Sequence, residues 1–582
     1  MRRGLVALRQ TDLRDLQWRL SEFGLSSLGH SEAHVQASLQ LISAAVAAMR
    51  GPRWNSSDYH PAVGTGEGAE LLGRNTRMLF GPAPEDRAAR IMVTLPSESA
   101  ADATLVTDLV EAGMRIARMN CAHDDPKAWK AMAANVRAAE ATTGQPCLVA
   151  MDLAGPKLRT GPLQPGPKVV RLRPTRNSLG QVTAAGRGWL TSAGKPARPP
   201  GTGMVTLPVD KGWLSRRREG DHLRVRDTRG ARRVLRVASA ARGGFVVTTE
   251  KSVHLSTGTR LKVDGANDAT TIGELPTTDQ AIRLKAGDIL RLTRDCSAAP
   301  VDDLGMPRIG CTLPEIFGVA AIGARVLFDD GRLGGKVVST GADDLKIRID
   351  HPSLGEVKLR GGKGINVPEM DLPISALTEQ DLKDLQTAVK IADIIELSFV
   401  REPTDVIQLF DELDRLHATD IGVVLKIETP RAFENLPQLI LTAMRRRRIG
   451  VMIARGDLAV ESGYERMAEL QQETLSLCEA AHLPVVWATQ VLEQLAKTGR
   501  PSRAEITDAA MSERAECVML NKGPFIIDAV IALDHILGRM AGRDYKGSSL
   551  LPGLDSWQRG PSNVAAAQSE WEMARPTISG SG

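Results

Sequence analysis

Eight short apolar runs, separated by longer amphipathic segments, constrain the fold of this 582-residue chain more than any other feature. They cover residues 91–93, 114–117, 148–151, 394–397, 423–426, 451–454, 485–488 and 517–520. Runs of this length, with helix-like segments between most of them, are typical of parallel strands joined by crossover helices. Eight repeats in roughly 250 residues, with a long central insertion set aside, predict an α/β fold of the closed (β/α)8 or TIM-barrel type.

The insertion between the third and fourth runs follows a different pattern. It is rich in Gly, Pro, Thr and Arg, and its alternating stretches, such as 222–225, 244–248 and 326–338, are typical of antiparallel strands. We therefore expect an inserted all-β domain, which we call the lid, over residues 162–367, enlarged enough for two β-modules. The barrel then comprises residues 89–161 and 368–542.

Both ends of the chain also differ from the barrel pattern. Leu13, Leu16 and Leu20 recur at helical spacing, so we predict an N-terminal helical extension over residues 1–88. A helical cap packed on the barrel is the favoured reading, and a partner-binding arm is the alternative. Residues 543–582 are rich in Gly, Ser and Pro, which predicts a flexible tail.

Charge and composition narrow the class of partners. The net charge of +5 is small for this length, and arginine runs such as 216–218 and 445–448 are read as solvated faces. Aromatic residues make up 3% of the chain, so few could stack on bases, and we predict no nucleic-acid partner. No apolar stretch reaches the length of a membrane span and no CxxC pair is present, so we expect a cytoplasmic protein without membrane contact or zinc.

Polar and ionisable residues follow five of the eight runs. In a barrel of this type the active site lies at the carboxyl ends of the strands. These residues are 118–123 after the second run, 152 and 155–159 after the third, 426–428 at the fifth, 454–458 at the sixth and 488–490 at the seventh. A single charged residue there could be an ion pair at a strand end, but five ends together predict a functional site.

The residue types indicate what this site could do. Glu428 and Asp457 are hard oxygen ligands on neighbouring strands, which suit Mg²⁺ better than a softer metal. Lys426 lies two residues before Glu428 and so on the same strand face, where its charge could stabilise a transferring phosphoryl group or an enolate oxygen. We expect Gly456 and Asp457 to open a helix whose first amides face an anion, with the hydroxyl of Thr489 nearby.

Taken together and in order, these segments resemble motifs of the pyruvate kinase family. Further matching segments are residues 328–331, 363–368, 398–401 and 500–505, and the resemblance extends from about residue 90 to 537. It implies a barrel with a mobile β-domain lid, and Mg²⁺- or Mn²⁺-dependent transfer of a phosphoryl group from phosphoenolpyruvate to ADP, giving pyruvate and ATP. Two alternatives stay open: a weak or inactive relative that binds phosphoenolpyruvate or nucleotide as a sensor, and a barrel enzyme acting on another enolpyruvate or oxo-acid.

The resemblance also implies a role for each matching residue. Arg118 would hold the substrate phosphate, Lys426 would stabilise the transition state, and a water chain near Thr489 would protonate the enolate. Glu428 and Asp457 would bind Mg²⁺. The substrate carboxylate would be held by Gly456, Asp457 and Thr489, and the nucleotide by Arg159, Lys363 and His123.

One part of the family pattern is altered. Most members bind K⁺ through a set that resembles Asn120, Asp152 and a nearby Ser and Thr. Here Ala122 and Leu153 occupy the Ser and Thr positions, which leaves only the backbone carbonyl of Leu153, and Lys157 stands where K⁺-requiring members carry Glu. Because a lysine ammonium is a fixed monovalent cation, we expect Lys157 to replace K⁺, so that no added K⁺ is required. The alternative is that Lys157 only pairs with Asp152.

Other departures concern loops and domains. The turn after the first run, 94–97, lacks the family's glycine, and residues 521–524 differ from the family's loop, which leaves the nucleotide preference open. The lid resembles the family only from about residue 284, so residues 164–282 have no counterpart. No C-terminal regulatory domain is recognised, so we expect no activation by sugar phosphates. We also expect a homo-oligomer, a dimer or tetramer, formed through the barrel.

Overall fold

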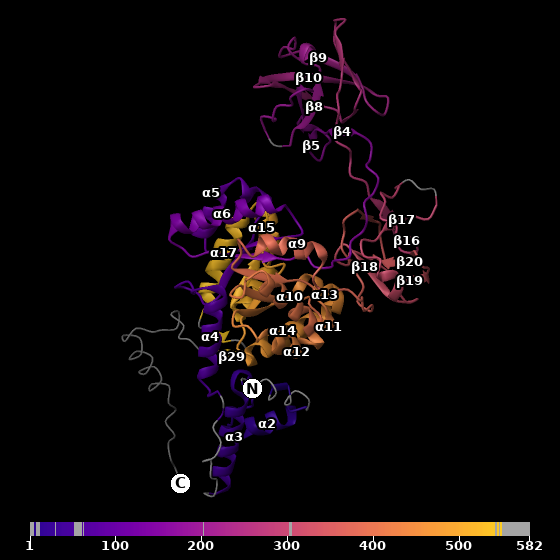
Figure 1. Cartoon of the computed structure of the whole chain (residues 1–582). Helices are drawn as coiled ribbons and strands as arrows, with labels where there is room; N and C mark the ends of the chain where they lie inside the picture. The colour runs from indigo at the N-terminus through magenta and orange to yellow at the C-terminus, as the bar shows by residue number, and fades with distance from the viewer. Residues whose placement is uncertain are drawn as a thin grey trace, which may run out of the picture. The chain divides into compact units, whose positions relative to one another are not determined.

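The computed structural model describes residues 5–6, 12–29, 31–51, 61, 63–201, 203–301, 305–541, 544–545 and 548–549. The chain forms two compact units, Met1–Lys157 with Asn366–Gly582, and Leu158–Ile365 (Figure 1). Apart from two short strands, β28 (Asp544–Tyr545) and β29 (Ser548–Ser549), the predicted tail lies outside the described residues.

A closed barrel of eight parallel strands forms the centre of the first unit. In barrel order the strands are β1 (Arg90–Thr94), β2 (Met114–Asn120), β3 (Leu148–Asp152), β23 (Ile394–Leu397), β24 (Gly422–Ile427), β25 (Ile449–Ala454), β26 (Val485–Ala488) and β27 (Cys517–Leu520). All eight coincide with the predicted apolar runs, so the (β/α)8 prediction is confirmed.

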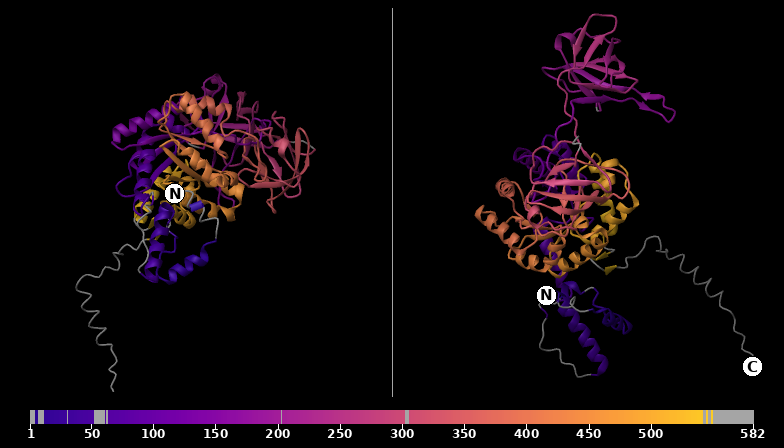
Figure 2. Two further views of the ribbon diagram at one scale, coloured as in Figure 1. Left: turned by 60° about the horizontal axis from the view of Figure 1, so that its bottom comes forward. Right: turned by 90° about the vertical axis from the view of Figure 1, so that its right-hand side faces the viewer.

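Helices surround these strands on the outside of the barrel (Figures 1 and 2). They are α5 (Ala103–Glu111), α6 (Pro126–Thr143), α9 (Glu379–Ala388), α10 (Pro403–Arg415), α11 (Pro430–Glu434), α12 (Leu436–Ala443), α13 (Arg455–Ser462), α14 (Tyr464–Ala480), α15 (Glu493–Thr498), α16 (Arg503–Met511) and α17 (Ile526–Met540). Local sequence sets their ends: α6 begins at an Asp125 cap followed by Pro126 and stops at Gly144, whose φ is 68°.

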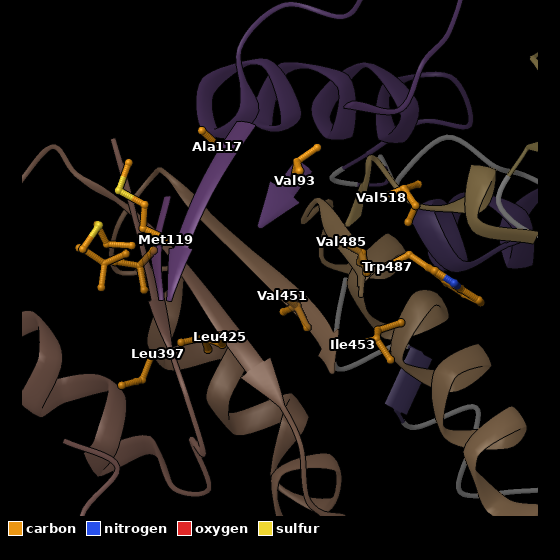
Figure 3. Close-up of a cluster of buried hydrophobic side chains, with 14 of the residues drawn as sticks. Val93, Ala117, Met119, Leu397, Leu425, Val451, Ile453, Val485, Trp487 and Val518 are labelled. Atoms are coloured by element: carbon orange, nitrogen blue, oxygen red, sulfur yellow. The ribbon is translucent and has the colours of Figure 1, made fainter. Parts of the chain in front are cut away.

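Alternation along the strands divides the buried side chains between two cores. Residues such as Val93, Met119, Leu425 and Trp487 point outward and pack with the helices (Figure 3). The next residue on each strand points into the barrel, because successive side chains lie on opposite faces. The inward positions nearer the strand starts are apolar and are occupied by Met92, Ile116, Ala150, Ile394, Val424, Met452 and Val486.

The last turn of an N-terminal helix closes this apolar end of the barrel. Leu79 and Phe80, at the end of α4 (Glu67–Phe80), belong to the same buried cluster as the inward residues. Leu79 lies against Gly422 and Gly450, where an added Cβ would come within 2.6 Å of its methyl groups. The predicted N-terminal helical extension is confirmed, with α2 (Arg14–Glu22) and α3 (Val35–Arg50) preceding α4.

The second unit is built from mostly antiparallel sheets, each of the two larger ones with one parallel pair, and two short helices, α7 (Lys211–Leu214) and α8 (Ile316–Val319), in agreement with the predicted all-β lid. One sheet has the order β17-β16-β20-β19-β18-β22. Its strands are β16 (Ile289–Thr293), β17 (Arg308–Gly310), β18 (Arg325–Phe328), β19 (Leu333–Thr340), β20 (Asp344–His351) and β22 (Ile365–Asn366), with β15 (Ile282–Leu284) pairing with β21 (Val357–Leu359) nearby in sequence.

Residues 169–271 form a further set of strands, which we call the β-module. A seven-stranded sheet has the order β14-β13-β9-β10-β11-β7-β8. Its strands are β7 (Gly186–Ser192), β8 (Val205–Val209), β9 (His222–Arg226), β10 (Arg232–Ala241), β11 (Gly244–Thr249), β13 (Arg260–Val263) and β14 (Ala269–Thr271), accompanied by β4 (Val169–Leu172), β12 (Val253–Ser256), β5 (Thr175–Arg176) and β6 (Val182–Ala184). One face of this sheet packs on a hydrophobic cluster that includes Leu223, Leu235 and Trp213.

None of the helices in the described ranges is both long enough and apolar enough to cross a membrane.

Candidate active site

Charged side chains line part of the barrel interior nearer the carboxyl ends of the strands. We call this the upper half, and the apolar half nearer the strand starts the lower half. Four adjacent strands, β2, β3, β23 and β24, each carry one inward charged residue two positions after their apolar inward residue. These are Arg118, Asp152, Glu396 and Lys426, and Glu428 follows β24. None of these five residues is more than 7% exposed. Because burying a charge is costly unless it is paired, their contacts decide what the cluster can do.

Arg118 is held by three partners. Its Nε donates to Glu396 Oε2 at 3.0 Å, one terminal nitrogen donates to Thr94 Oγ1 at 2.7 Å, and the other pairs with Asp152. Burial lowers the pKa of the guanidinium, but Asp152 and Glu396 outweigh it, and the pKa lies above its ordinary value. The side chain is therefore a fixed, permanently charged cation at the barrel mouth.

Lys426 is the second buried cation of the cluster. Its Nζ donates to Asp152 Oδ1 at 2.9 Å and to Ser398 Oγ at 2.7 Å, and lies 3.2 Å from Glu428 Oε1. Burial lowers the pKa of Lys426, but the carboxylates of Asp152 and Glu428 raise it by more, so the pKa lies above its usual range. The structure thus brings together the predicted residues Arg118, Lys426 and Glu428.

Glu428 and Asp457 are the two carboxylates predicted to bind a divalent cation, and their charges interact in the structure. Oε2 of Glu428 accepts from the Phe399 amide at 2.5 Å. Burial raises the pKa of Glu428, and the charge of Asp457 raises it further, so a cation between the two would be stabilised by both. Within the described ranges no three His, Cys, Asp or Glu residues form a metal-binding group. Two carboxylates with water and substrate oxygens are a usual environment for Mg²⁺.

Lys157 pairs with Asp457, so the alternative that it pairs with Asp152 is wrong. Its Nζ lies 2.7 Å and 3.0 Å from the two carboxylate oxygens of Asp457, and 5.8 Å from the centre of the Phe399 ring. Asp152 is already engaged by other donors, and Asn120 Oδ1 accepts from the Ala122 amide at 2.9 Å. The side-chain oxygens of Asp152 and Asn120 are therefore occupied by protein donors, and a lysine ammonium lies beside the candidate metal ligand Asp457.

Gly456 and Thr489 are joined by a hydrogen bond. α13 begins directly after β25, as predicted, and the Gly456 amide donates to Thr489 Oγ1 at 2.8 Å. Thr489 has a φ of 64°, which is rare for a β-branched residue. Arg455 holds this turn by donating to Ala488 O at 3.0 Å and to Thr489 O at 2.6 Å. The strained turn is thus fixed in position, as strained residues at functional sites commonly are.

The predicted nucleotide contacts fall in both units. Within the lid, Lys363 Nζ lies 2.8 Å from Asp329 Oδ1, and Arg159 donates to Gly362 O at 3.3 Å. A bridge between Arg159 and Gly364 places Arg159 and Lys363 on adjacent segments. His123 belongs to the first unit, where its carbonyl accepts from Trp129 Nε1 at 3.0 Å. Their role with a nucleotide stays a prediction.

Sequence reasoning missed Glu396, which contacts Arg118 from inside an apolar run. The residue is fully buried, and burial raises its pKa to about 7. Its Oε1 has no hydrogen-bond partner within the described residues. A charged residue in the sequence Ile394–Leu397 was itself the signal, because a glutamate is almost never buried without a partner. The inward position of Ile394 would have placed Glu396 inside the barrel as well.

Comparison with known proteins agrees with this barrel. The sequence model of the family described as pyruvate kinase, barrel domain, matches residues 86–184 and 243–525. The pyruvate kinase of Bacillus licheniformis is 30% identical over 267 residues, which are 44% of this chain and 43% of that protein. The pyruvate kinase of Corynebacterium efficiens is 32% identical over 244 residues, 41% of this chain and 49% of that protein.

The matched stretches thus span less than half the length of these relatives. A solved pyruvate kinase structure from Cryptosporidium parvum has a TM-score of 0.53 at 22% identity, covering 80% of this chain and 72% of that chain, which shows the shared fold. The family match includes every residue of the charged cluster and both candidate metal ligands. It also accounts for more than half of the chain, and on that ground the chain belongs to the pyruvate kinase family.

Proposed function

We propose that the chain is an active pyruvate kinase that transfers the phosphoryl group of phosphoenolpyruvate to ADP. One observation carries the proposal: two buried cations, Arg118 and Lys426, share the barrel mouth with the carboxylate pair Glu428 and Asp457. A charged cluster of this kind costs stability when buried, so its retention is best explained by chemistry on a multiply charged substrate.

Each side chain has a defined task in this reaction. Arg118, oriented by Glu396 and Thr94, binds the substrate phosphate through its remaining donors. Lys426, fixed by Asp152 and Ser398, stabilises negative charge that develops on the transferring group and on the enolate oxygen. The donors are already in place before substrate arrives, which is the condition for electrostatic catalysis.

Mg²⁺ would be held by Glu428 and Asp457 and, when bound, would neutralise phosphate charge. Gly456 and Thr489 lie in the turn and helix start beside Asp457 and are proposed to hold the substrate carboxylate, with a water near Thr489 protonating the enolate. Arg159, Lys363 and His123 are the proposed nucleotide contacts.

Lys157 is the proposed replacement for K⁺. Its ammonium contacts both oxygens of Asp457, so it supplies one fixed positive charge next to the metal ligand. With the oxygens of Asp152 and Asn120 engaged by protein donors, we propose that activity needs no added K⁺. We further propose a cytoplasmic location and a homo-oligomer formed through the barrel.

The Lys157–Asp457 ion pair also supports a second candidate function. A metal ion at Asp457 competes with this ammonium for the same oxygens. If the ammonium prevails, the metal site is weak, and the chain would bind phosphoenolpyruvate or nucleotide as a sensor with little turnover.

A coupled assay for pyruvate formation from phosphoenolpyruvate, ADP and Mg²⁺ separates the two functions. We expect turnover by the wild type and a loss on the order of 10³-fold or more in Lys426→Met, because that change removes a charge used in the transition state. Lys390→Met, at an exposed lysine on the same unit, is the matched control and should leave the rate unchanged. A wild type that binds phosphoenolpyruvate in calorimetry but forms no pyruvate would favour the sensor.

A further inference from the structure

The β-module has a charge unlike that of the rest of the chain. Residues 169–271 contain 20 Lys and Arg but only 7 Asp and Glu, a net charge of +13, whereas the whole chain has +5. The remaining residues are therefore net negative. A charge so concentrated in one small domain indicates a surface for an anionic partner.

Strand alternation gathers much of this charge on one face of the seven-stranded sheet. Leu223, Val225, Leu235 and Leu261 are buried in the core of the module, and their strand neighbours point to the opposite, exposed face. We call that side the cationic face. It lies on β7, β9, β10 and β13, of which β9 and β10 are labelled in Figure 1, and it includes the six cations Arg187, Arg224, Arg226, Arg232, Arg236 and Lys262.

Strand register sets like charges directly opposite each other on this face. Arg232 pairs with Arg226 across β10 and β9, and Lys262 pairs with Arg224 across β13 and β9. Directly opposed like charges destabilise a sheet. Sheet stability therefore does not explain why the cations stand there, and an external anion does.

Internal counterions engage one of these six cations among the described residues. Arg224 pairs with Asp264 at 2.5 Å, yet its side chain remains 67% exposed. The other five make no ion pair with any residue in the described ranges. In the same module Arg216 and Arg217 share Asp268, so acidic partners are present but are used elsewhere.

We propose that the cationic face binds the phosphodiester backbone of a nucleic acid, RNA or DNA, without reading its bases. Five of the six cations are arginines, whose planar guanidinium groups match phosphate oxygens through paired hydrogen bonds. His222 is exposed on the same face, but no Phe, Tyr or Trp side chain is exposed there among the described residues, so the contacts are mainly to phosphate rather than by base stacking.

The same surface fits other anionic partners less well. Val234, 46% exposed, is the one large apolar side chain exposed on these four strands as the structure describes them. A membrane-binding surface would add several Trp, Phe or Leu side chains, and a protein interface would have an aromatic or aliphatic centre. A repeated phosphate backbone needs only the charge.

The cationic face is also distinct from what the chain shares with its family. The family match omits residues 185–242, and five of the six cations lie in that stretch. The proposal is thus independent of the proposed phosphoryl transfer. It replaces the expectation of no nucleic-acid partner, which interpreted arginine runs as solvated faces and relied on the scarcity of aromatic residues.

Fluorescence anisotropy with the full-length protein tests the proposal. The probes are labelled duplex DNA, duplex RNA and single-stranded RNA of one sequence, each titrated across a series of salt concentrations. We expect binding that weakens steeply with salt, and comparison of the three probes identifies the nucleic acid. The triple variant Arg226→Gln, Arg232→Gln, Arg236→Gln should bind at least about tenfold more weakly at low salt. It should also lower the slope of log K against log salt by about 3, since each lost phosphate contact contributes about one.

A matched triple variant removes the same charge elsewhere. Arg445→Gln, Arg447→Gln, Arg466→Gln changes three exposed arginines of the first unit and should bind like the wild type. The proposal is overturned if the wild type binds none of the three probes at low salt, if both triples lose affinity equally, or if only vesicles containing an acidic phospholipid are bound. If the first triple proves unfolded, Arg226→Gln and Arg226→Lys decide: the slope should fall by about 1 in the former only, and equal slopes overturn the proposal.

Discussion

The two halves of the barrel interior are built from the same strands but differ in the chemistry of their inward side chains. In the lower half the inward residues are apolar, and Leu79 fills the space between two strand glycines. Two residues further along four of these strands the inward residues are Arg118, Asp152, Glu396 and Lys426, which are also buried. Apolar burial stabilises a fold, whereas replacing buried ion pairs by apolar residues is often neutral or stabilising. Two residues along a strand, the spacing between successive inward side chains, therefore separate the half that stabilises the barrel from the half that is available for chemistry.

The largest effect on stability is expected in the lower half, and it should not extend to substrate binding. Leu79→Ala removes a side chain that is completely buried against Gly422 and Gly450. Leucine-to-alanine changes at such sites cost about 3–4 kcal/mol, because packing around the cavity relaxes only in part. Denaturant unfolding followed by circular dichroism should show the loss, with the KM for phosphoenolpyruvate unchanged. Leu441→Ala, at a leucine that is 56% exposed, is the control and should change stability little. A large change in KM for Leu79→Ala would break the division between the halves.

The next effect concerns the cation at the mouth of the upper half. Lys157→Glu removes the ammonium that contacts Asp457 and adds a carboxylate beside it. We expect the wild type to be equally active with K⁺, Na⁺ or tetramethylammonium salts. The variant should lose at least about tenfold in kcat without K⁺, ~1.4 kcal/mol, and recover when K⁺ is added. Lys130→Glu, at an exposed lysine on α6, makes the same charge change far from these contacts and should show no response to K⁺. Strong K⁺ activation of the wild type would contradict the proposed role of Lys157.

The sequence predicted the halves unequally. Apolar runs gave all eight strands because burial on both faces leaves a nearly continuous apolar stretch. The run at 114–117 stopped short of Asn120, since charged residues of the upper half interrupt the apolar pattern although the strand continues. Lys426 and Glu428 were found because they stand at a strand end. Glu396 was missed because it lies within a run.

Other features depend on contacts that no local pattern encodes. Lys157 and Asp457 are 300 positions apart, and which carboxylate the lysine reaches is decided by how the segment after β3 meets the first turn of α13. The cationic face required the pairing of β9 with β10 and β13, because register alone turns arginines that are dispersed in the sequence into neighbours. The sequence therefore identified candidate site residues, but it did not show which residues contact one another.

The smallest effect tests whether Glu396 restrains Arg118. Glutamine keeps an oxygen that can accept from Arg118 Nε but removes the negative charge, leaving Asp152 as the one carboxylate paired with the guanidinium. Because burial already raises the pKa of Glu396 to about 7, the neutral side chain should be accommodated with little change in stability. With less of its charge offset, Arg118 should attract the substrate phosphate more strongly, so Glu396→Gln should lower the KM for phosphoenolpyruvate by roughly two- to fivefold. Steady-state kinetics with Glu412→Gln as a control at a partly exposed glutamate decide the point. A KM that rises instead would mean that the carboxylate is needed to orient Arg118, and that the upper half depends on geometry more than on its net charge.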